Sequence, residues 1–303
     1  MSQSSKNLKL IYRKLKISDF KEFQKLFYSC FKRNISYKFY KWRYFNGDSS
    51  FCYGVFISNK LIANVGMVLK ELSNNQREKV YSRHSSMVLK KYRGIGIFSK
   101  LLRIVKNKIE KNISYIVMWP NKKNLSNFDI DIQNILNKKF YIYKTTSSQN
   151  FKKKTTNLNI ENLKKNKNSI KSNSSFFLKN FIKLKKRYLM YKKNDYYINQ
   201  YKLDNLRSFF ILKRNKEKSL LNRVILDHFG SKKLKNKHLF YLIQNQNNLV
   251  FLSKKKINKD NYELINDINF KIGFIKKISL KKKRTFLKNK DIFLGDTDIY
   301  IRI

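Results

Sequence analysis

The hydrophobic pattern of the first half predicts strands and helices that alternate along the chain. Residues 12–17 alternate between polar and apolar like an edge strand, and Ser18 and Asp19 then precede a helical pattern. Further strands are expected at 53–57, 61–68, 80–89 and 114–119. A second helix is expected after the strand at 80–89. Its apolar stripe consists of Phe98, Leu101, Leu102, Val105 and Ile109.

The second half has a similar order of elements. Residues 208–213 and 220–227 predict paired strands, a basic helix extends to about residue 245, and residues 248–252 predict another strand. A short helix near residues 262–268 and strands at 273–275 and 298–303 complete the expectation. Because this order mirrors the first half, the sequence predicts an α/β fold (α+β mixed sheet) built from two tandem copies of one unit.

Length and composition divide the chain in the same way. Its 303 residues suit two domains of about 150 residues, each able to bury a core. Residues 150–175 are rich in Lys, Asn, Ser and Thr and have few large apolar residues, which is typical of a linker. We therefore expect a first domain at residues 1–150, a linker at 151–175 and a second domain at 176–303.

The turn at residues 93–96, Arg-Gly-Ile-Gly, carries the clearest chemical signal. Its glycines would let several backbone N–H groups approach one anion, and the helix that follows would add the positive end of its dipole. Two glycines can equally serve a tight turn alone. The pattern GxxxxGK[ST] is absent, and GxGxxG fails because Phe98 and Ser99 follow where its third glycine belongs. The turn therefore favours another class of phosphate-bearing ligand.

These residues resemble a known family. The run from Val88 through Arg93, Gly94 and Gly96 to Phe98 is similar to the acyl-CoA pyrophosphate motif of the GCN5-related N-acetyltransferases, the GNAT superfamily. The usual form is Arg/Gln-x-x-Gly-x-Gly/Ala, and the Phe at the last small position matches the branch that reads RGxG-aliphatic-Phe. Residues 39–44 also resemble the W-(K/R)-Y element of some members. The resemblance implies a GNAT-like fold with splayed central strands, and acetyl-CoA or another acyl-CoA as co-substrate.

The resemblance also implies which residues bind the acyl-CoA. Backbone N–H groups of Met87, Val88 and Leu89 would pair with the acyl oxygen and the pantetheine amides. Asn121, just after the only proline of the chain, would hydrogen-bond the pantetheine or pyrophosphate, although an Asn in this place is equally typical of a turn. The pyrophosphate itself would lie on the turn and the start of its helix, at Arg93, Gly94, Ile95, Gly96, Ile97 and Phe98.

Acyl transfer to an amine requires a polarised carbonyl and an unprotonated amine. Ser85 stands where members often have a glutamate, so we consider His84 beside it as the base, because the reference pKa of histidine is about 6.5. Strand alternation puts His84 on the face of Ser86 and opposite Ser85. Glu71, at the end of the third strand, is a second candidate, and a water chain without a dedicated base is a third.

The expected acid is also displaced from its usual place. The common Tyr-x-x-x-Gly-Phe motif is missing, because Ile135 occupies the position of its tyrosine. Tyr141 or Tyr143 could replace it as the proton donor to the departing thiolate, although strand tyrosines more often serve packing. In the second copy, Asp227 precedes the equivalent loop and would repel a pyrophosphate, so only the first copy is expected to bind acyl-CoA.

The net charge of +50 and the pI near 10.2 would suggest a nucleic acid or an anionic membrane surface as partner. Lysine is spread along the whole chain together with asparagine and isoleucine, which AT-biased codon usage would produce. Zinc-finger spacing, a basic leucine zipper and RNP-type motifs are absent from the sequence. The charge therefore favours phosphorylated ligands or peripheral contact with acidic lipid headgroups over nucleic acid.

Two cysteines, Cys30 and Cys52, have no metal-ligand spacing and indicate a reducing compartment. His84, His228 and His238 lie far apart in the sequence, so no metal is expected. The sequence contains neither an apolar run of 18 residues nor a signal-peptide pattern at its start, which predicts a cytoplasmic protein.

Three functions fit these observations. The leading expectation is an N-acyltransferase that moves an acyl group from acyl-CoA to a primary amine. By analogy with the W-(K/R)-Y branch, the acceptor would be an amino sugar of cell-surface polysaccharide biosynthesis, possibly nucleotide-linked. The alternatives are a basic module that binds nucleic acid or an anionic surface, and a catalytically silent GNAT-like scaffold. Acyl chain length and oligomeric state do not follow from the sequence.

Overall fold

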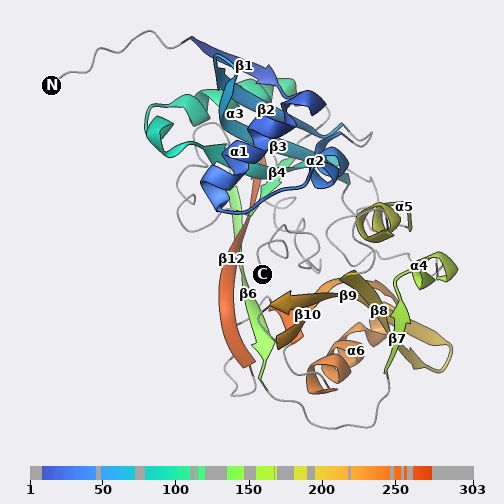
Figure 1. Cartoon of the computed structure of the whole chain (residues 1–303). Helices are drawn as coiled ribbons and strands as arrows, with labels where there is room; N and C mark the ends of the chain where they lie inside the picture. Colours follow the sequence, from blue (N-terminus) through green and yellow to red (C-terminus); the bar gives the residue numbers. More distant parts are fainter. Residues whose placement is uncertain are drawn as a thin grey trace.

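The computed structural model places two α/β lobes along one continuous sheet (Figure 1). It describes residues 9–45, 49–71, 79–109, 113, 115–119, 135–146, 155–166, 168, 181–189, 195–217, 220–245, 249–253, 256–257 and 262–274.

The first lobe follows the predicted order closely. Its strands are β1 (Leu10–Lys14), β2 (Phe51–Ile57), β3 (Lys60–Glu71), β4 (Lys79–Val88) and β5 (Tyr115–Met118). Its helices are α1 (Phe20–Phe31), α2 (Tyr37–Tyr44) and α3 (Ile97–Lys108). Adjacent strands from β1 to β4 pair antiparallel, whereas β4 and β5, which α3 connects, are parallel.

The second lobe repeats this arrangement. Its strands are β7 (Thr155–Asn159), β8 (Tyr196–Leu203), β9 (Leu206–Glu217), β10 (Leu220–Gly230) and β11 (Leu249–Ser253), and α6 (Lys232–Asn245) joins the last two, which are again parallel. The short helices α4 (Asn162–Lys165) and α5 (Phe181–Leu184) lie before β8. The predicted strand pair and the helix that follows it are confirmed.

Two long strands are exchanged between the lobes. The sheet order is β1-β2-β3-β4-β5-β12-β6-β11-β10-β9-β8-β7, with β6 at Ile135–Thr145 and β12 at Tyr262–Phe274. The late strand β12 therefore pairs with β5 of the first lobe, and the early strand β6 pairs with β11 of the second. The two strands run side by side between the lobes in Figure 1 and pair antiparallel along their length.

The prediction of a short helix near residues 262–268 is wrong, because these residues belong to β12. Pairing with β6 from residue 262 to residue 273 outweighs the local helical pattern. Residues 155–166, inside the segment predicted to be a linker, form β7 and α4, and Ile160 and Leu163 are buried. The strand expected at residues 298–303 lies outside the described residues.

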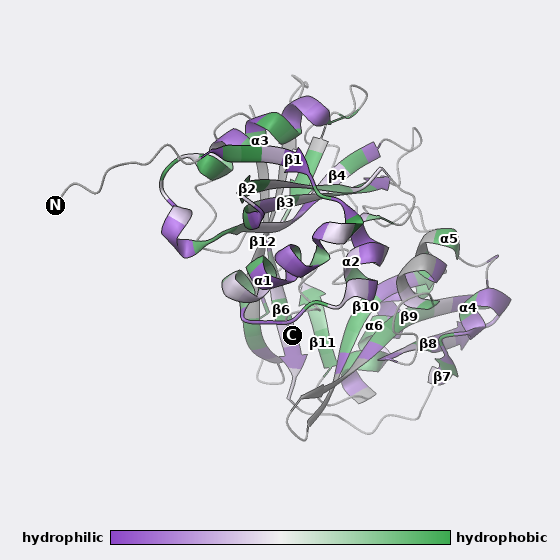
Figure 2. Ribbon diagram, turned by 45° about the horizontal axis from the view of Figure 1, so that its top comes forward, coloured by the Kyte–Doolittle hydropathy of each residue, from purple (hydrophilic) through white to green (hydrophobic). Residues whose placement is uncertain are grey.

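Hydrophobic clusters cover both faces of the first part of the sheet. The apolar face of α3 packs through Leu101 and Val105 onto Val65 and Met67 of β3. In Figure 2 this helix alternates between hydrophobic and hydrophilic segments, as a helix with one buried face does. On the opposite face, α1 and α2 cover the strands with a cluster rich in aromatic side chains.

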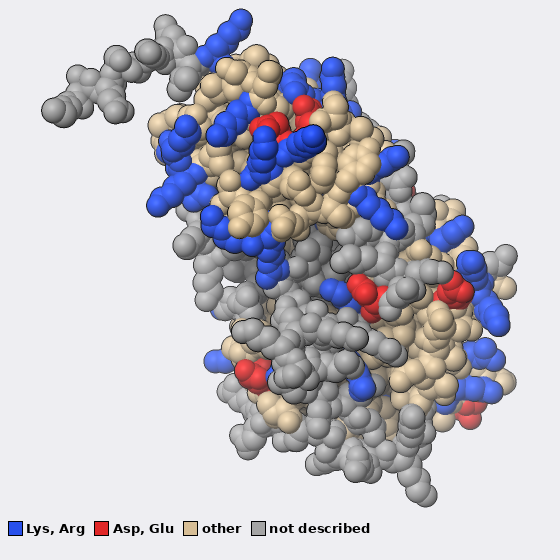
Figure 3. Space-filling view, viewed as in Figure 1, with Lys and Arg blue, Asp and Glu red and all other residues tan. Residues whose placement is uncertain are grey.

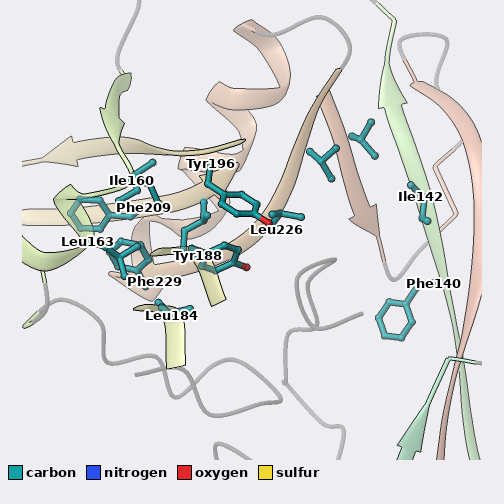
Figure 4. Close-up of a cluster of buried hydrophobic side chains, with 14 of the residues drawn as sticks. Phe140, Ile142, Ile160, Leu163, Leu184, Tyr188, Tyr196, Phe209, Leu226 and Phe229 are labelled. Atoms are coloured by element: carbon teal, nitrogen blue, oxygen red, sulfur yellow. The ribbon is translucent and has the colours of Figure 1, made fainter. Parts of the chain in front are cut away.

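A third cluster joins the lobes. It contains Val80 and Val117 of the first lobe together with Tyr188, Phe209 and other side chains of the second. Phe140 and Ile142 of β6 belong to this cluster, as Figure 4 shows. The exchanged strand therefore supplies core residues to the second lobe. None of the helices in the described ranges combines the length and the apolar content needed to cross a lipid bilayer.

Candidate functional site

The turn between β4 and α3 has the open geometry that an anion site requires. Gly94 and Gly96 adopt φ angles of 84° and 77°, which side chains of L-residues rarely permit. A Cβ atom placed on either glycine would meet nothing within 4 Å. Gly96 caps α3 without a side-chain hydrogen bond, and the first turn of α3 contains no acidic residue. The first N–H groups of α3 are thus left for a ligand with negative charge.

A cavity of about 820 Å³ lies beside this turn. It is bounded by the end of β4, the end of α1 and the start of α3. None of the described residues that line it is acidic, whereas two are arginines. The lining residues are Cys30, Phe31, Arg83, Ser86, Met87, Val88, Tyr92, Arg93, Gly94, Gly96, Ile97, Phe98 and Ser99.

The cavity follows the end of β4. The described pairs between β4 and β5 are Tyr81 with Ile116 and Ser82 with Val117, while β4 continues to Val88. The described pairing of these strands therefore ends before the stretch of β4 that lines the cavity. The residues that follow Trp119 lie outside the described ones, so the splay expected from the resemblance stays a prediction.

Strand alternation decides which backbone groups of β4 face the cavity side. The N–H of Leu89 donates to the carbonyl oxygen of Ile62 on β3, at 2.9 Å, so it is already engaged. In an antiparallel ladder, residues alternate in the direction of their backbone groups, so Met87 faces β3 as Leu89 does and Val88 faces away. Among the three predicted amides, the one of Val88 is therefore the one that points away from β3.

The other predicted cofactor residues have different positions at the turn. The Nε–H of Arg93 donates to the carbonyl oxygen of Val88 at 3.0 Å and ties the turn to the end of β4. Ile97 is buried beneath the helix start, and Phe98 lines the cavity. Ile95 is 65% exposed and is not among the lining residues. Asn121 lies outside the described residues.

A β-bulge at Ser85 and Ser86 shapes the floor of the site. Asn64 pairs with Met87 and Gly66 pairs with His84, so two residues of β4 stand opposite one of β3. Ser85 takes a φ of 46°. The side-chain amide of Asn64 donates to the Ser85 carbonyl oxygen at 3.0 Å, which holds the bulge in place.

The bulge reverses the predicted order of side chains. The hydroxyl groups of Ser85 and Tyr44 are 2.7 Å apart, and a Cβ on Gly66 would meet the Tyr44 ring at 2.6 Å. Since Gly66 is the register partner of His84, Ser85 reaches the same face as His84. Ser86 instead lines the cavity with Arg83. The prediction that His84 shares a face with Ser86 is therefore wrong, because the extra residue shifts the alternation.

The structure does not bring the three candidate catalytic residues together. His84 is buried on β4 next to the cavity wall, on the face that α2 covers. Glu71 pairs with Lys79 at the far end of the β3–β4 hairpin, and the seven residues that separate it from Asn64 span about 23 Å. Tyr141 lies on β6 opposite Ser253 and Asp267. None of the three is among the described lining residues.

Several lining residues were missed by sequence reasoning. Cys30 and Phe31, at the end of α1, enter the site only through the tertiary fold. The Cys30 thiol donates to the Val88 carbonyl oxygen at 3.6 Å. Burial raises the pKa of this thiol, and the nearby Arg93 guanidinium partly offsets the effect. The sequence signal for Arg83 is a charged side chain inside a predicted strand, between the buried Ser82 and His84.

The equivalent turn of the second lobe is closed. Gly230 has a φ of 92°, but a Cβ there would meet the carbonyl oxygen of Arg207 at 2.6 Å. That oxygen also accepts a hydrogen bond from the Ser231 N–H at 2.7 Å. Asp227 is fully buried on β10, where it accepts a hydrogen bond from the Tyr188 hydroxyl. The backbone of β9 therefore occupies the space above Gly230, whereas the space above Gly94 and Gly96 is open.

Within the described ranges, no group of three or more His, Cys, Asp or Glu side chains could hold a metal ion. Lys and Arg side chains are spread over both lobes of the face seen in Figure 3, with few acidic ones between them. Positive charge is therefore common to the general surface and the cavity. The cavity differs from the surface because its positive charge is enclosed.

Neither a protein-family model nor a curated protein matches this sequence. Solved structures do match its fold. A GCN5-related N-acetyltransferase from Anabaena variabilis aligns over 88% of this chain and 73% of its own, at 10% identity and a TM-score of 0.63. One from Kribbella flavida aligns over 88% and 72%, at 8% identity and a TM-score of 0.54. A probable N-acyltransferase from Enterococcus faecalis aligns over 87% and 72%, at 11% identity and a TM-score of 0.62. The sheet with its parallel β4–β5 pair, the glycine turn and these similarities together show that the chain has the fold of the GCN5-related N-acetyltransferases.

Proposed function

We propose that this protein is an acyl-CoA-dependent N-acyltransferase, which moves an acyl group, in the simplest case acetyl, to a primary amine. The observation that carries the proposal is the open space above Gly94 and Gly96, next to the uncapped start of α3 and a cavity with no acidic residue among its described lining. A pyrophosphate matches this environment because its charge complements the helix dipole and its oxygens accept backbone N–H bonds.

The acyl-CoA would supply an activated thioester, and the chain would supply its orientation. Arg93 fixes the turn against Val88, so the phosphate site and the end of β4 keep a constant distance. The Val88 N–H, which is aimed away from β3, would donate a hydrogen bond to the acyl oxygen and stabilise the charge that develops there. Apolar groups of Met87 and Phe98 on the cavity wall would exclude water.

We assign the removal of a proton from the amine to His84. Its strand borders the cavity, and Arg83 beside it and Ser86 two residues further along β4 line the cavity wall. Glu71 does not suit this task because it lies at the far end of the hairpin, about 13 Å along β3 from Met67, the partner of Arg83. An amino sugar, possibly nucleotide-linked, is the proposed acceptor, on the strength of the Trp42-Arg43-Tyr44 element of α2. A cytoplasmic location belongs to the same proposal.

Isothermal titration with acetyl-CoA tests the proposal. The wild-type protein should release or absorb heat at submillimolar ligand, and Gly96→Glu should abolish that signal because a carboxylate fills the open space and repels phosphate. Gly96→Ala is the matched control, because its side chain causes the same backbone strain at a positive φ angle but adds no charge. This strain costs of order 1 kcal/mol. It should bind more weakly than the wild type but detectably, and the circular dichroism of both variants should be unchanged.

Two results would contradict the proposal. Absence of any heat with the wild-type protein would favour a silent scaffold or a surface-binding module. Unchanged binding by Gly96→Glu would show that the ligand does not use this turn. Where binding is confirmed, release of the free CoA thiol in the presence of a panel of amino sugars identifies the acceptor.

A further inference from the structure

Ser85 has a backbone conformation that is unusual inside a strand. Its φ angle is 46°. The other non-glycine residues with a positive φ angle in the described part of the chain lie at a helix end or in hairpin turns, and they are Lys32, Ser58 and Asp204. Glycine adopts this region more readily than serine does. Residues held in such conformations collect at active sites and ligand clamps, so the serine side chain calls for a functional explanation.

Neighbours on α2 and β3 hold Ser85 in this conformation. The Tyr44 hydroxyl on α2 lies 2.7 Å from the Ser85 hydroxyl. Gly66 on β3 leaves room for the Tyr44 ring, which a Cβ there would meet at 2.6 Å. Asn64 on the same strand donates to the Ser85 carbonyl oxygen at 3.0 Å. The Ser85 hydroxyl is therefore fixed in its direction as well as in its place.

The hydroxyl pair leaves Ser85 able to bind one more group. Tyr44 is 1% exposed, whereas Ser85 is only partly buried. A serine hydroxyl has one hydrogen to donate and two lone pairs that accept. When Ser85 donates its hydrogen to the Tyr44 oxygen, its lone pairs can accept a hydrogen bond from an N–H group. Hydrogen bonds that run in one direction strengthen each other, so this arrangement favours an amine as the donor.

The position of Ser85 along β4 fits an amine that attacks the acyl group. Val88, whose N–H is the proposed partner of the acyl oxygen, lies three residues further, or at most about 10 Å in an extended strand. Two hydrogen bonds and the approach of the nitrogen to the acyl carbon measure about 3 Å each, and together they cover a similar distance. Ser86 and Met87, which lie between the two residues, line the cavity.

We propose that Ser85 binds the amino group of the acceptor, and that Tyr44 positions Ser85 for this task. This inference rests on the proposed function. The nitrogen forms the new bond to the acyl carbon, and the carbon–sulfur bond of the thioester breaks. The nitrogen loses a proton to His84, and the departing CoA thiolate takes up one in its place. Ser85 keeps its own hydrogen throughout, so it orients the amine and does not act as the base.

Steady-state kinetics of the wild type and four variants test the inference. The acyl donor is acetyl-CoA, and the probe amines are glucosamine, galactosamine and mannosamine. Ser85→Ala and Ser85→Gly should both lower kcat/KM for the amine roughly 10- to 100-fold, as expected for a lost hydrogen bond to the reacting group. The calorimetric Kd for acetyl-CoA should stay unchanged. Tyr44→Phe should lower kcat/KM roughly 3- to 10-fold, because Ser85 remains but its hydroxyl is no longer held.

Tyr40→Phe is the matched control for Tyr44→Phe. Tyr40 lies on the same helix and in the same buried aromatic cluster, and its hydroxyl donates to the Lys16 carbonyl oxygen at 3.0 Å. Its loss should lower the thermal stability as Tyr44→Phe does but leave kcat/KM at the wild-type value. Ser85→Gly separates the hydroxyl from the backbone, because glycine relieves the positive φ angle. It should be more stable than Ser85→Ala and equally slow.

A wild-type kcat/KM in Ser85→Gly would overturn the inference and reduce Ser85 to a structural role, while the proposed function stands. Equal losses of kcat/KM in Tyr40→Phe and Tyr44→Phe would overturn the positioning role of Tyr44. A wild type that binds acetyl-CoA but releases no CoA thiol with any of the three amines would overturn the inference as well. If the wild type does not bind acetyl-CoA, the proposed function fails with it. Ser85→Gly provides the comparison if Ser85→Ala does not fold.

Discussion

The hydroxyl group of Ser208 lies 3.0 Å from Nδ1 of His238 in the core of the second lobe, where both residues are fully buried. The same hydroxyl lies 3.0 Å from Nε2 of His228, and Nε2 of His238 lies 2.7 Å from the side-chain oxygen of Asn199. Because that oxygen only accepts, His238 donates through Nε2 and accepts through Nδ1. Ser208 therefore donates its hydroxyl hydrogen to His238 and accepts a hydrogen bond from His228. The hydrogen bonds of this network thus all run in one direction, from His228 through Ser208 and His238 to Asn199.

This arrangement makes the stability of the protein depend on pH. Burial lowers the pKa of His238 from 6.5 to about 3. The unfolded chain therefore binds one more proton than the folded chain between these values, and the free energy of unfolding falls as the pH falls from about 6.5 toward 3. The slope that His238 gives to the free energy of unfolding approaches about 1.4 kcal/mol per pH unit between these two pH values. Above them, the slope from His238 vanishes.

Urea unfolding at several pH values measures this slope. His238→Gln is the control, because glutamine retains a donor and an acceptor but does not titrate. The variant should be less stable than the wild type at pH 7, and the difference between the two should shrink as the solution is acidified. A difference that is constant from pH 7 to pH 4 would contradict the assignment of His238 as a buried neutral group.

Much of the first lobe follows from local sequence signals. The helical spacing from Phe98 to Ile109 and the glycines at 94 and 96 fix the turn and α3 within a residue or two. These features are local, so tertiary contacts do not have to be known to predict them. The bulge at Ser85 differs, since it depends on the pairing of Asn64 with the Ser85 carbonyl from another strand. Strict alternation therefore gave the wrong face for Ser86.

The exchange of β6 and β12 is the largest feature that the sequence did not predict. Residues 262–268 have apolar positions compatible with a short helix, and only pairing with strands from both lobes makes residues 262–274 one long strand. Packing of α1 against β3 and β4, which are also distant in sequence, explains why Cys30, Phe31 and Arg83 could not be assigned to one cavity beforehand. Contacts between residues far apart in sequence leave little trace in a single chain.

The exchange predicts that damage to β12 destabilises the first lobe. Ile272 pairs with Val117 of β5 and with Leu136 of β6, so a proline there disrupts pairing in the centre of the sheet. Ile272→Pro should lower the stability by about 1–3 kcal/mol, the cost of leaving a buried backbone group without its hydrogen bond. Trp42 packs in the aromatic cluster of the first lobe, and Trp119 packs against the cluster that joins the lobes, so the two tryptophans report on the first lobe and its junction with the second. The unfolding transition that their fluorescence reports should therefore occur at a lower urea concentration in this variant.

Thr156→Pro is the matched control for this experiment. It places a proline in β7, which stands at the outer end of the described sheet order next to β8. Its effect on the tryptophan transition should be clearly smaller, because an edge strand tolerates proline better than a central one. If the tryptophan fluorescence transition occurs at the same urea concentration in the wild type and in Ile272→Pro, the lobes unfold independently. That result would contradict the prediction that the shared strands couple their stability.

The two cysteines provide a direct probe of the cavity. Cys30 lines the cavity and is partly exposed, whereas Cys52 is completely buried in the first lobe. A maleimide should therefore modify the folded protein once, at Cys30. Because burial raises the pKa of that thiol, the reaction should be slower than with a free thiol at pH 7 and should accelerate as the pH rises.

Bound acyl-CoA should protect Cys30, because the ligand would lie between the reagent and the thiol. Intact-protein mass spectrometry over time, with and without acetyl-CoA, measures the protection, and Cys30→Ser should remain unmodified under the same conditions. Gly96→Glu should lose the protection but keep the basal rate, because it blocks the ligand and leaves the thiol in place. Rapid modification of Cys52 in the folded protein, or an unchanged Cys30 rate at a ligand concentration that saturates the calorimetric signal, would place the bound ligand away from the end of α1.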